Sequence, residues 1–292
     1  MQIQLHKTKI IDYPSGSALE FYNDTLYVVG DDVHYILCLD AGWNEINRIT
    51  LFDYEAKRIP KPDKPDLECA TIIQDILYVV GSGSKSPQRD VAFIIPLAEQ
   101  KVKRISTAAF YALFRDRNLI AEMNIEGFTD CKDKLLFFNR ANNTQPNQLI
   151  ISDHKIIQKQ FPNSFKVMPV QMPNLKGIPL GISGACYVAT DDILLLTASA
   201  ENTDNAYDDG AIVGSVLAII RNAYQQLNQK IIDVQEVYLL DDIDARFLHQ
   251  KIESICLTQN NQTTYTCVLV ADNDDGKSVL FEISIPRTFT SL

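Results

Sequence analysis

A short motif recurs along the 292-residue chain, in which a glutamate follows an aliphatic residue and precedes a small or apolar one. The glutamates are Glu20, Glu68, Glu126 and Glu253, and a fifth copy of the pattern carries Ser183 instead. Carboxylates that converge from separate segments repel one another, so they must bind a cation, pair with Arg or Lys, take up protons or accept backbone hydrogen bonds. The motifs are Ser17-Ala18-Leu19-Glu20, Asp66-Leu67-Glu68-Cys69, Asn124-Ile125-Glu126-Gly127, Gly181-Ile182-Ser183-Gly184 and Lys251-Ile252-Glu253-Ser254.

Each motif is followed by a polar turn and then by a run of β-branched, aliphatic and aromatic residues. This order predicts five β-hairpins, whose second strands span 26–29, 76–80, 135–138, 193–197 and 265–270. The turns are Asn23-Asp24, Gln74-Asp75, Lys132-Asp133-Lys134, Asp191-Asp192 and Asn260-Asn261-Gln262. The spacing of the motifs leaves room for two further strands in each unit. Third strands are expected at 35–39, 91–95, 148–152, 211–220 and 278–284.

A recurring unit of four antiparallel strands is typical of a β-propeller blade. We predict an all-β fold, a single β-propeller domain over residues 1–292 with five blades, and six blades as the alternative count. The last unit ends before a fourth strand, so the N-terminal strand at 2–11 is expected to complete it and close the ring. Helical excursions are expected at 107–114, 222–228 and 242–250. A β-sandwich with Greek-key connections is the main rival fold.

The two ends of each hairpin indicate where a site would lie. In an antiparallel hairpin, the start of the first strand and the end of the second lie at the same end of the sheet. The motif positions are therefore expected to form a ring at one mouth of the channel. We predict a small-molecule site there, formed by Glu20, Glu68, Glu126, Ser183, Glu253, Asn139 and Arg140. The other residues that leave the second strands are Asp31, Asp32, Ser82, Ser84, Ser199, Glu201, Asp272 and Asn273.

Carboxylate and amide oxygens are the ligands that Ca²⁺ and Mg²⁺ prefer in proteins. Calcium is therefore the predicted cofactor, and no organic cofactor is expected. Two alternatives stay open: the glutamates accept backbone hydrogen bonds from the neighbouring blade, or Arg140 serves as an internal counterion. The four histidines show no metal-binding spacing, so zinc is not predicted. The predicted calcium ligands are Glu68, Glu126, Glu253, Asp272 and Asn273.

Three loops suggest chemistry that their sequences do not fully support. Residues 272–276 begin like an EF-hand loop but lack its Gly at position six and its Glu at position twelve, so we interpret them as a hairpin turn. Residues 81–86 lack the Walker pattern and are interpreted as a flexible loop between strands. The acidic loop 202–210, with Asp204, Asp208 and Asp209, is expected at the same mouth as the glutamates.

The overall composition argues against some classes of binding partner. The formal charge of −10 opposes binding to nucleic acid or to an anionic membrane surface. The longest apolar run, 211–220, is too short for a membrane-spanning helix of about 20 residues. Six scattered cysteines without a CxxC pair favour buried thiols and a reducing compartment, so we predict a cytoplasmic protein, although a chain trimmed of a secretory leader would look the same.

Two of the motifs resemble the blade starts of the phytase-like (esterase-like phytase) β-propeller family and its bacterial relatives. They are Asn124-Ile125-Glu126-Gly127-Phe128 and Lys251-Ile252-Glu253-Ser254-Ile255, and the strand end at 268–273 is similar to that family's Asp-Asn ending. Asp66-Leu67-Glu68 followed by 78–82 is similar to blades of calcium-dependent lactonases as well. The resemblance implies a channel mouth that binds calcium and a phosphoester or a lactone, with a metal-bound water as the attacking group.

Two hypotheses about function follow. In the first, the chain is a calcium-dependent hydrolase of a small phosphoester, ester or lactone, whose catalytic residues the sequence does not identify. In the second, it is a noncatalytic propeller that binds a protein or carbohydrate partner, because this fold supports many unrelated functions. Calcium binding and its loss in Glu126→Gln would separate them.

Overall fold

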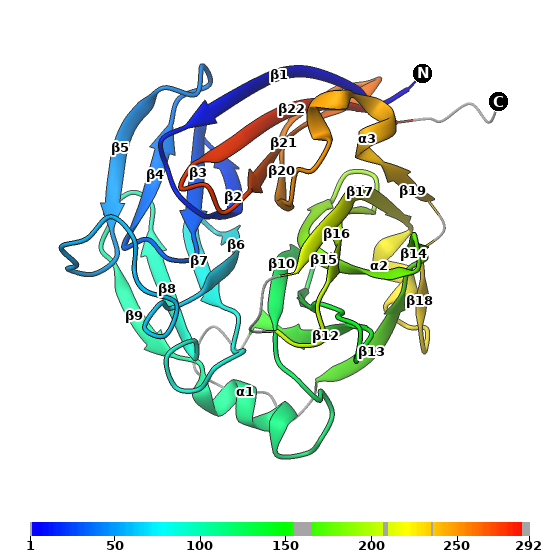
Figure 1. The fold of residues 1–292 in the computed structure, drawn as a ribbon, viewed down its shortest axis with the longest axis horizontal. Helices are drawn as coiled ribbons and strands as arrows, with labels where there is room; N and C mark the ends of the chain where they lie inside the picture. Colours follow the sequence, from blue (N-terminus) through cyan, green and yellow to red (C-terminus); the bar gives the residue numbers. More distant parts are fainter. Residues whose placement is uncertain (1, 155–164, 207–209, 235, 288–292) are drawn as a thin grey trace.

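Five antiparallel sheets surround one axis, and the chain visits them in sequence order (Figure 1). This computed structural model describes residues 2–154, 165–206, 210–234 and 236–287. The fold is an all-β, five-bladed β-propeller, which confirms the predicted class and number of blades. The alternative count of six blades and the β-sandwich are wrong.

Each sequence motif lies at or near the start of the innermost strand of one blade. Blade one contains β2 (Gly16–Tyr22), β3 (Thr25–Gly30), β4 (Tyr35–Leu39) and β5 (Glu45–Thr50), and blade two contains β6 (Leu67–Ile73), β7 (Ile76–Gly81), β8 (Val91–Pro96) and β9 (Lys103–Ser106). Blade three contains β10 (Ile125–Cys131), β11 (Lys134–Asn139), β12 (Asn147–Asp153) and β13 (Lys166–Gln171). Blade four contains β15 (Ile178–Val188), β16 (Ile193–Asn202), β17 (Ala211–Arg221) and β19 (Glu236–Leu239). Blade five contains β20 (Ile252–Asn260), β21 (Thr264–Asp272), β22 (Ser278–Pro286) and β1 (Gln4–Ile11).

Polar two-residue turns produce the inner hairpins of blades one and two. Asn23 and Asp24 have φ angles of 48° and 57°, and Gln74 and Asp75 have φ angles of 49° and 63°. Positive φ at both central residues matches the right-handed twist of the flanking strands. The turns predicted from these dipeptides are therefore confirmed.

Ring closure depends on the N-terminal strand. β1 pairs antiparallel with β22 from Gln4 opposite Ser284 to Ile11 opposite Ser278, so blade five is built from both ends of the chain. The structure thus confirms that the N-terminal strand completes the last blade. The five predicted third strands also form, as β4, β8, β12, β17 and β22.

Helices lie where the sequence predicted helical excursions, but two of them are shorter. α1 (Ala108–Arg115) buries Phe110, Tyr111 and Phe114. α2 (Ala223–Gln226) occupies part of the second predicted segment, and α3 (Leu240–Ile243) with a 3-10 helix (Ala245–Phe247) overlaps the third. Two short strands were not predicted: β14 (Asn174–Leu175) pairs with β15, and β18 (Ile232–Asp233) pairs parallel with β13 of the preceding blade.

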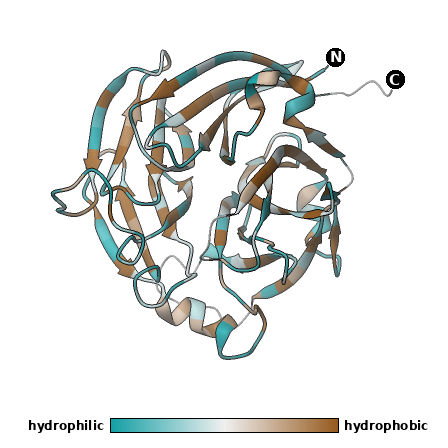
Figure 2. Cartoon of the chain, viewed as in Figure 1, coloured by the Kyte–Doolittle hydropathy of each residue, from teal (hydrophilic) through white to brown (hydrophobic). Residues whose placement is uncertain are grey.

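Apolar side chains fill the spaces between neighbouring blades, and the apolar stretches lie along the strands (Figure 2). Val28 of blade one, for example, shares a buried cluster with Val268 and Leu280 of blade five. The six cysteines are free thiols, and all except Cys186 are buried. Within the described part of the chain, no helix combines the length and the apolar character needed to cross a membrane.

Candidate functional site

A β-bulge marks the start of every inner hairpin. The pairing between the first two strands of each blade skips one residue near the beginning of the first strand. Such a bulge turns the extra side chain out of the regular alternation and commonly occurs beside functional sites. The five skipped residues are Ser17, Glu68, Glu126, Ser183 and Glu253.

The position predicted for Glu20 is wrong. Glu20 lies three residues beyond the bulge of β2 and pairs with Tyr27, and Ser17 occupies the position equivalent to Glu68. Glu20 does not line the cavity described below. Its burial raises the pKa of the carboxyl group to about 8. The distance to the turn reveals the error, because Asn23 follows Ser17 at the same interval at which Gln74 follows Glu68.

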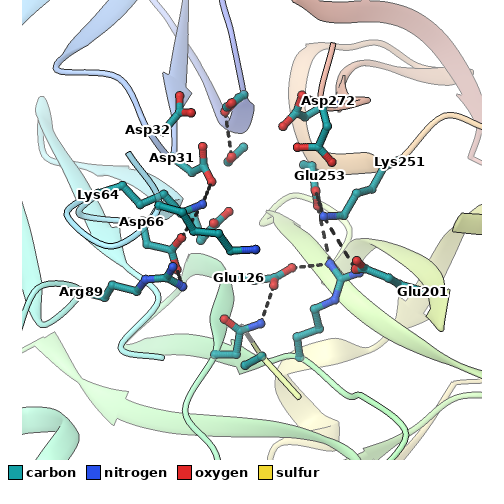
Figure 3. Close-up of a pocket in the computed structure, with 18 of the residues that line it drawn as sticks. Asp31, Asp32, Lys64, Asp66, Arg89, Glu126, Glu201, Lys251, Glu253 and Asp272 are labelled. Atoms are coloured by element: carbon teal, nitrogen blue, oxygen red, sulfur yellow. Dashed lines mark hydrogen bonds and ion pairs between the residues drawn. The ribbon is translucent and has the colours of Figure 1, made fainter. Parts of the chain in front are cut away.

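A polar cavity of about 360 Å³ opens at the mouth where the bulges lie (Figure 3). All five blades contribute to its wall. Among the described residues, the apolar ones that line the cavity are Ile59, Pro60, Ala141 and Ala206. Carboxylates outnumber basic groups there, as the net charge of the chain would suggest. The acidic residues are Asp31, Asp32, Asp66, Glu68, Glu126, Glu201, Glu253, Asp272 and Asp274, and the basic residues are Arg58, Lys61, Lys64, Arg89, Arg140 and Lys251.

Arg140 joins the carboxylates of three blades on one side of the cavity (Figure 3). Its guanidinium lies 2.5 Å from Glu126, 2.9 Å from Glu201 and 3.6 Å from Glu253. Lys251 adds a contact of 2.9 Å to Glu253. Burial raises the pKa of Glu126 to about 7, although Arg140 opposes this rise. Arg140 therefore serves as an internal counterion for Glu126, Glu201 and Glu253, which was one of the two alternatives to calcium binding.

Blades one and two place a second carboxylate group on the other side. Ligand oxygens of Asp31, Asp66 and Glu68 all lie within 4.8 Å of one another, which is close enough for one metal ion to contact all three. Lys64 forms ion pairs with Asp31 and, at 2.8 Å, with Asp66, and Arg89 lies 2.6 Å from Asp66. We call Asp31, Asp66 and Glu68 the acidic trio.

The members of the acidic trio differ in their electrostatic environment. Burial raises the pKa of Asp31 to about 6 and that of Glu68 well above its ordinary value. Burial also opposes ionisation of Asp66, but Lys64 and Arg89 outweigh it and hold the pKa of Asp66 below the ordinary value. One oxygen of Asp31 is buried without a hydrogen-bond partner, and Glu68 has no hydrogen bond or ion pair among the described residues. Both groups therefore have capacity to bind a cation.

The remaining predicted site residues divide into cavity and supporting positions. Asp272 lines the cavity, and burial raises its pKa to about 7. Asn139 and Asn273 do not line it: Asn139 accepts a hydrogen bond from the Asn124 backbone, and Asn273 accepts one from the Lys251 backbone. Ser183 donates its hydroxyl to the backbone carbonyl of Ile252 at 2.6 Å. These three residues therefore hold the backbone of the mouth.

Several cavity residues were missed by the sequence reasoning, although a signal for them was present. Ser15, Asp66, Asn124 and Lys251 each stand two residues before a bulge, and all four line the cavity. Strand residues two apart share a side, so the motifs themselves pointed to these positions. Lys64 and Arg58 lie in the connection between β5 and β6, which carries no repeat.

The acidic loop reaches the same mouth, as expected, through Thr203, Asn205 and Ala206. Asp208 and Asp209 lie outside the described residues. Residues 272–276 comprise the last residue of β21 and most of its connection to β22, with positive φ at Asp274 and Gly276, which confirms the hairpin turn.

Comparison with known proteins gives a family and a fold. A sequence family described as a family of unknown function (DUF6929) matches residues 12–285. No curated protein sequence matches the chain. The structure is similar to the glutaminyl cyclase of Myxococcus xanthus, with a TM-score of 0.55 and 10% identity, over 98% of this chain and 97% of that chain.

A second similar structure comes from the GH130 family of mannoside phosphorylases, whose glycoside hydrolases target β-1,2 mannosidic linkages in Candida mannan. Its TM-score is 0.53 and its identity is 9%, over 92% of this chain and 85% of that chain. Identities this low establish a shared fold alone. The resemblance to the phytase-like family is not confirmed by these matches.

Proposed function

This chain belongs to the DUF6929 family, and we propose that its axial cavity binds a divalent cation, with calcium the first candidate, together with a small polar ester or lactone that it hydrolyses. The observation that carries the proposal is the acidic trio. Three carboxylates converge within reach of a single ion, and one oxygen of Asp31 is buried without a hydrogen-bond partner. An oxygen-only ligand set suits Ca²⁺ or Mg²⁺ better than a soft metal.

The cation would be held by Asp31, Asp66 and Glu68. When bound, it would supply Lewis acidity toward the carbonyl oxygen of a substrate. Asp272 has no ion pair within the described chain, and burial raises its pKa to about 7, which suits a group that gives or takes a proton near neutral pH. We assign proton transfer to Asp272 on this basis.

The charge distribution favours an uncharged substrate over a phosphoester. Arg140, Lys251, Lys64 and Arg89 are already paired with cavity carboxylates. A phosphate would have to break such pairs and would face the excess of carboxylates in the wall. The sparse apolar lining disfavours a large hydrophobic acyl group. A small, oxygen-rich lactone or ester fits both conditions.

Calorimetric titration with Ca²⁺ tests the metal part of the proposal. Wild type is expected to bind one ion, and Glu68→Gln is expected to weaken binding by at least about tenfold, because one anionic ligand is lost. Glu20→Gln is the matched control, since Glu20 is a partly buried glutamate outside the cavity. Equal binding by all three proteins would exclude the acidic trio as the site.

Activity is tested separately with a panel of small lactones and esters in the presence of Ca²⁺. The proposal expects turnover that is lost in Asp272→Asn while Ca²⁺ binding persists. A protein that binds Ca²⁺ but hydrolyses none of these compounds would favour the alternative function.

That alternative is a noncatalytic propeller that binds a carbohydrate or protein partner. The observation in its favour is the network around Arg140, because it links residues of blades three, four and five through their charges. A fully paired buried network rigidifies its surroundings, which suits a binding surface that does no chemistry.

A further inference from the structure

The connection between β5 and β6, residues 51–66, covers one side of the cavity. Arg58, Ile59, Pro60, Lys61 and Lys64 of this segment line the cavity wall. We call residues 51–65 of this connection the covering segment, because Asp66 belongs to the acidic trio. It leaves blade one at the outer strand and returns to the inner strand of blade two (Figure 1), so it must cross the mouth.

The covering segment is fixed to blade one by a small set of contacts. The Ile59 amide donates a hydrogen bond to the Asp32 carbonyl at 2.8 Å, and Ile59 itself is buried. Arg58 lies 2.6 Å from the Asp32 carboxylate and 3.1 Å from the Ser15 hydroxyl. None of these contacts involves a carboxylate oxygen of the acidic trio.

Lys64 makes the contacts that reach the acidic trio. Its ammonium group is paired with Asp31 and lies 2.8 Å from Asp66, so it contacts two of the three carboxylates (Figure 3). The Lys64 side chain is only 14% exposed. The segment that covers the cavity therefore already supplies a cation to the proposed metal ligands.

A divalent cation and the Lys64 ammonium cannot both occupy contact distance to Asp31 and Asp66 without strong mutual repulsion. We propose that Lys64 is a tethered competitor for the metal, so that cation binding displaces its side chain and releases the covering segment from the trio. This inference rests on the proposed function and specifies how the same site is regulated. Cation entry and opening of the mouth are then one event.

Calorimetric titration of the full chain with Ca²⁺ tests this exchange. Lys64→Met keeps the length of the side chain and removes its charge, and it is expected to bind Ca²⁺ at least about tenfold more tightly than wild type. Lys57→Met removes a charge from the same segment at an exposed site paired with Asp12, so its affinity is expected to stay within about twofold of wild type.

Each outcome of this titration supports or overturns the inference. Tighter binding by Lys64→Met alone, together with measurable binding by wild type, supports it. If only the variant binds Ca²⁺, Lys64 blocks the site without being displaced, which overturns both the inference and the proposed function. Equal or weaker binding by a folded Lys64→Met overturns the inference while wild-type binding preserves the proposed function. An absence of binding in both proteins overturns both.

A measurement on wild type keeps the test open if Lys64→Met fails to fold. An acetylating reagent modifies lysine amines that solvent can reach, and Lys64 is largely buried and paired with two carboxylates when no cation is bound. Displacement of Lys64 is expected to speed acetylation of its side chain when saturating Ca²⁺ is added, as followed by mass spectrometry. Acetylation of Lys101, which is exposed in the connection between β8 and β9, is the internal control and is expected to stay constant. Unchanged or slower acetylation of Lys64 in Ca²⁺-saturated protein contradicts the exchange.

Discussion

Arg140 is the residue on which the charge balance of one side of the cavity depends. Its side chain is 6% exposed and faces Glu126, Glu201 and Glu253, whose side chains are almost as deeply buried. Removing one partner of a buried ion pair leaves an uncompensated charge, which typically costs about 3 to 5 kcal/mol. Arg140→Met is expected to lower the free energy of unfolding by that amount, as measured by urea denaturation near pH 7.

Arg48→Met provides the matched control for this loss. Arg48 pairs with Glu45 at a site where both side chains are about half exposed, so its removal is expected to cost less than about 1 kcal/mol. Similar small losses in the two variants would mean that the cavity carboxylates are not held as charged groups by Arg140.

Glu20 predicts a specific dependence of stability on pH. Burial raises its pKa from 4.5 to about 8. A carboxyl group with a raised pKa holds a proton longer in the folded state, so its stabilising contribution is complete below about pH 4.5 and is lost as the pH rises toward 8. Relative to Glu20→Gln, wild type should therefore lose up to about 1.4 kcal/mol per pH unit in this interval.

Urea denaturation of both proteins at several pH values measures this slope. Glu45→Gln is the control, because Arg48 holds the pKa of Glu45 below its ordinary value and no slope is expected from it above about pH 5. Parallel stability curves for wild type and Glu20→Gln would show that the carboxyl group of Glu20 ionises in the folded protein as it does in the unfolded chain.

At the scale of elements, the inner hairpins were the most predictable part of the chain. A polar turn followed by a β-branched run recurs five times, and each of these runs forms a strand. The register within them was harder to predict, because Leu19-Glu20 imitates the motif three residues too late. Lys64 and β18 could not be predicted, since an irregular connection and a strand of two residues carry no periodic pattern.

Blade-to-blade contact near the bulges depends on a small residue in blade four. A Cβ atom on Gly184 would lie 2.6 Å from the Thr197 hydroxyl and 2.7 Å from the Ser254 backbone of blade five. Gly184→Ala is therefore expected to force the two blades apart and to lower the free energy of unfolding by about 1 to 3 kcal/mol. Thermal and urea denaturation measure this effect.

Gly42→Ala is the control at this scale. A Cβ atom there would meet only the side chains of Asn44 and Asp40 in an exposed turn, and these side chains can move, so the expected change is within about 0.5 kcal/mol. A tolerated Gly184→Ala would indicate that the blades slide past each other near the mouth, and the cavity would then be less rigid than its contacts imply.

For the whole molecule, the ring is closed by hydrogen bonds and packing, because the six cysteines are free. The closing strand β1 offers two adjacent isoleucines with opposite environments. Ile11 is 6% exposed and belongs to the cluster between blades five and one, and Ile10 is 64% exposed.

If packing of β1 closes the ring, Ile11→Ala should lower the free energy of unfolding by about 2 to 5 kcal/mol, and Ile10→Ala should change it by less than about 0.5 kcal/mol. Urea denaturation compares the two, and equal effects would mean that blade five holds its place without β1. The cavity wall would then not depend on closure, because Asp272 and Glu253 would be positioned by β20 and β21 alone.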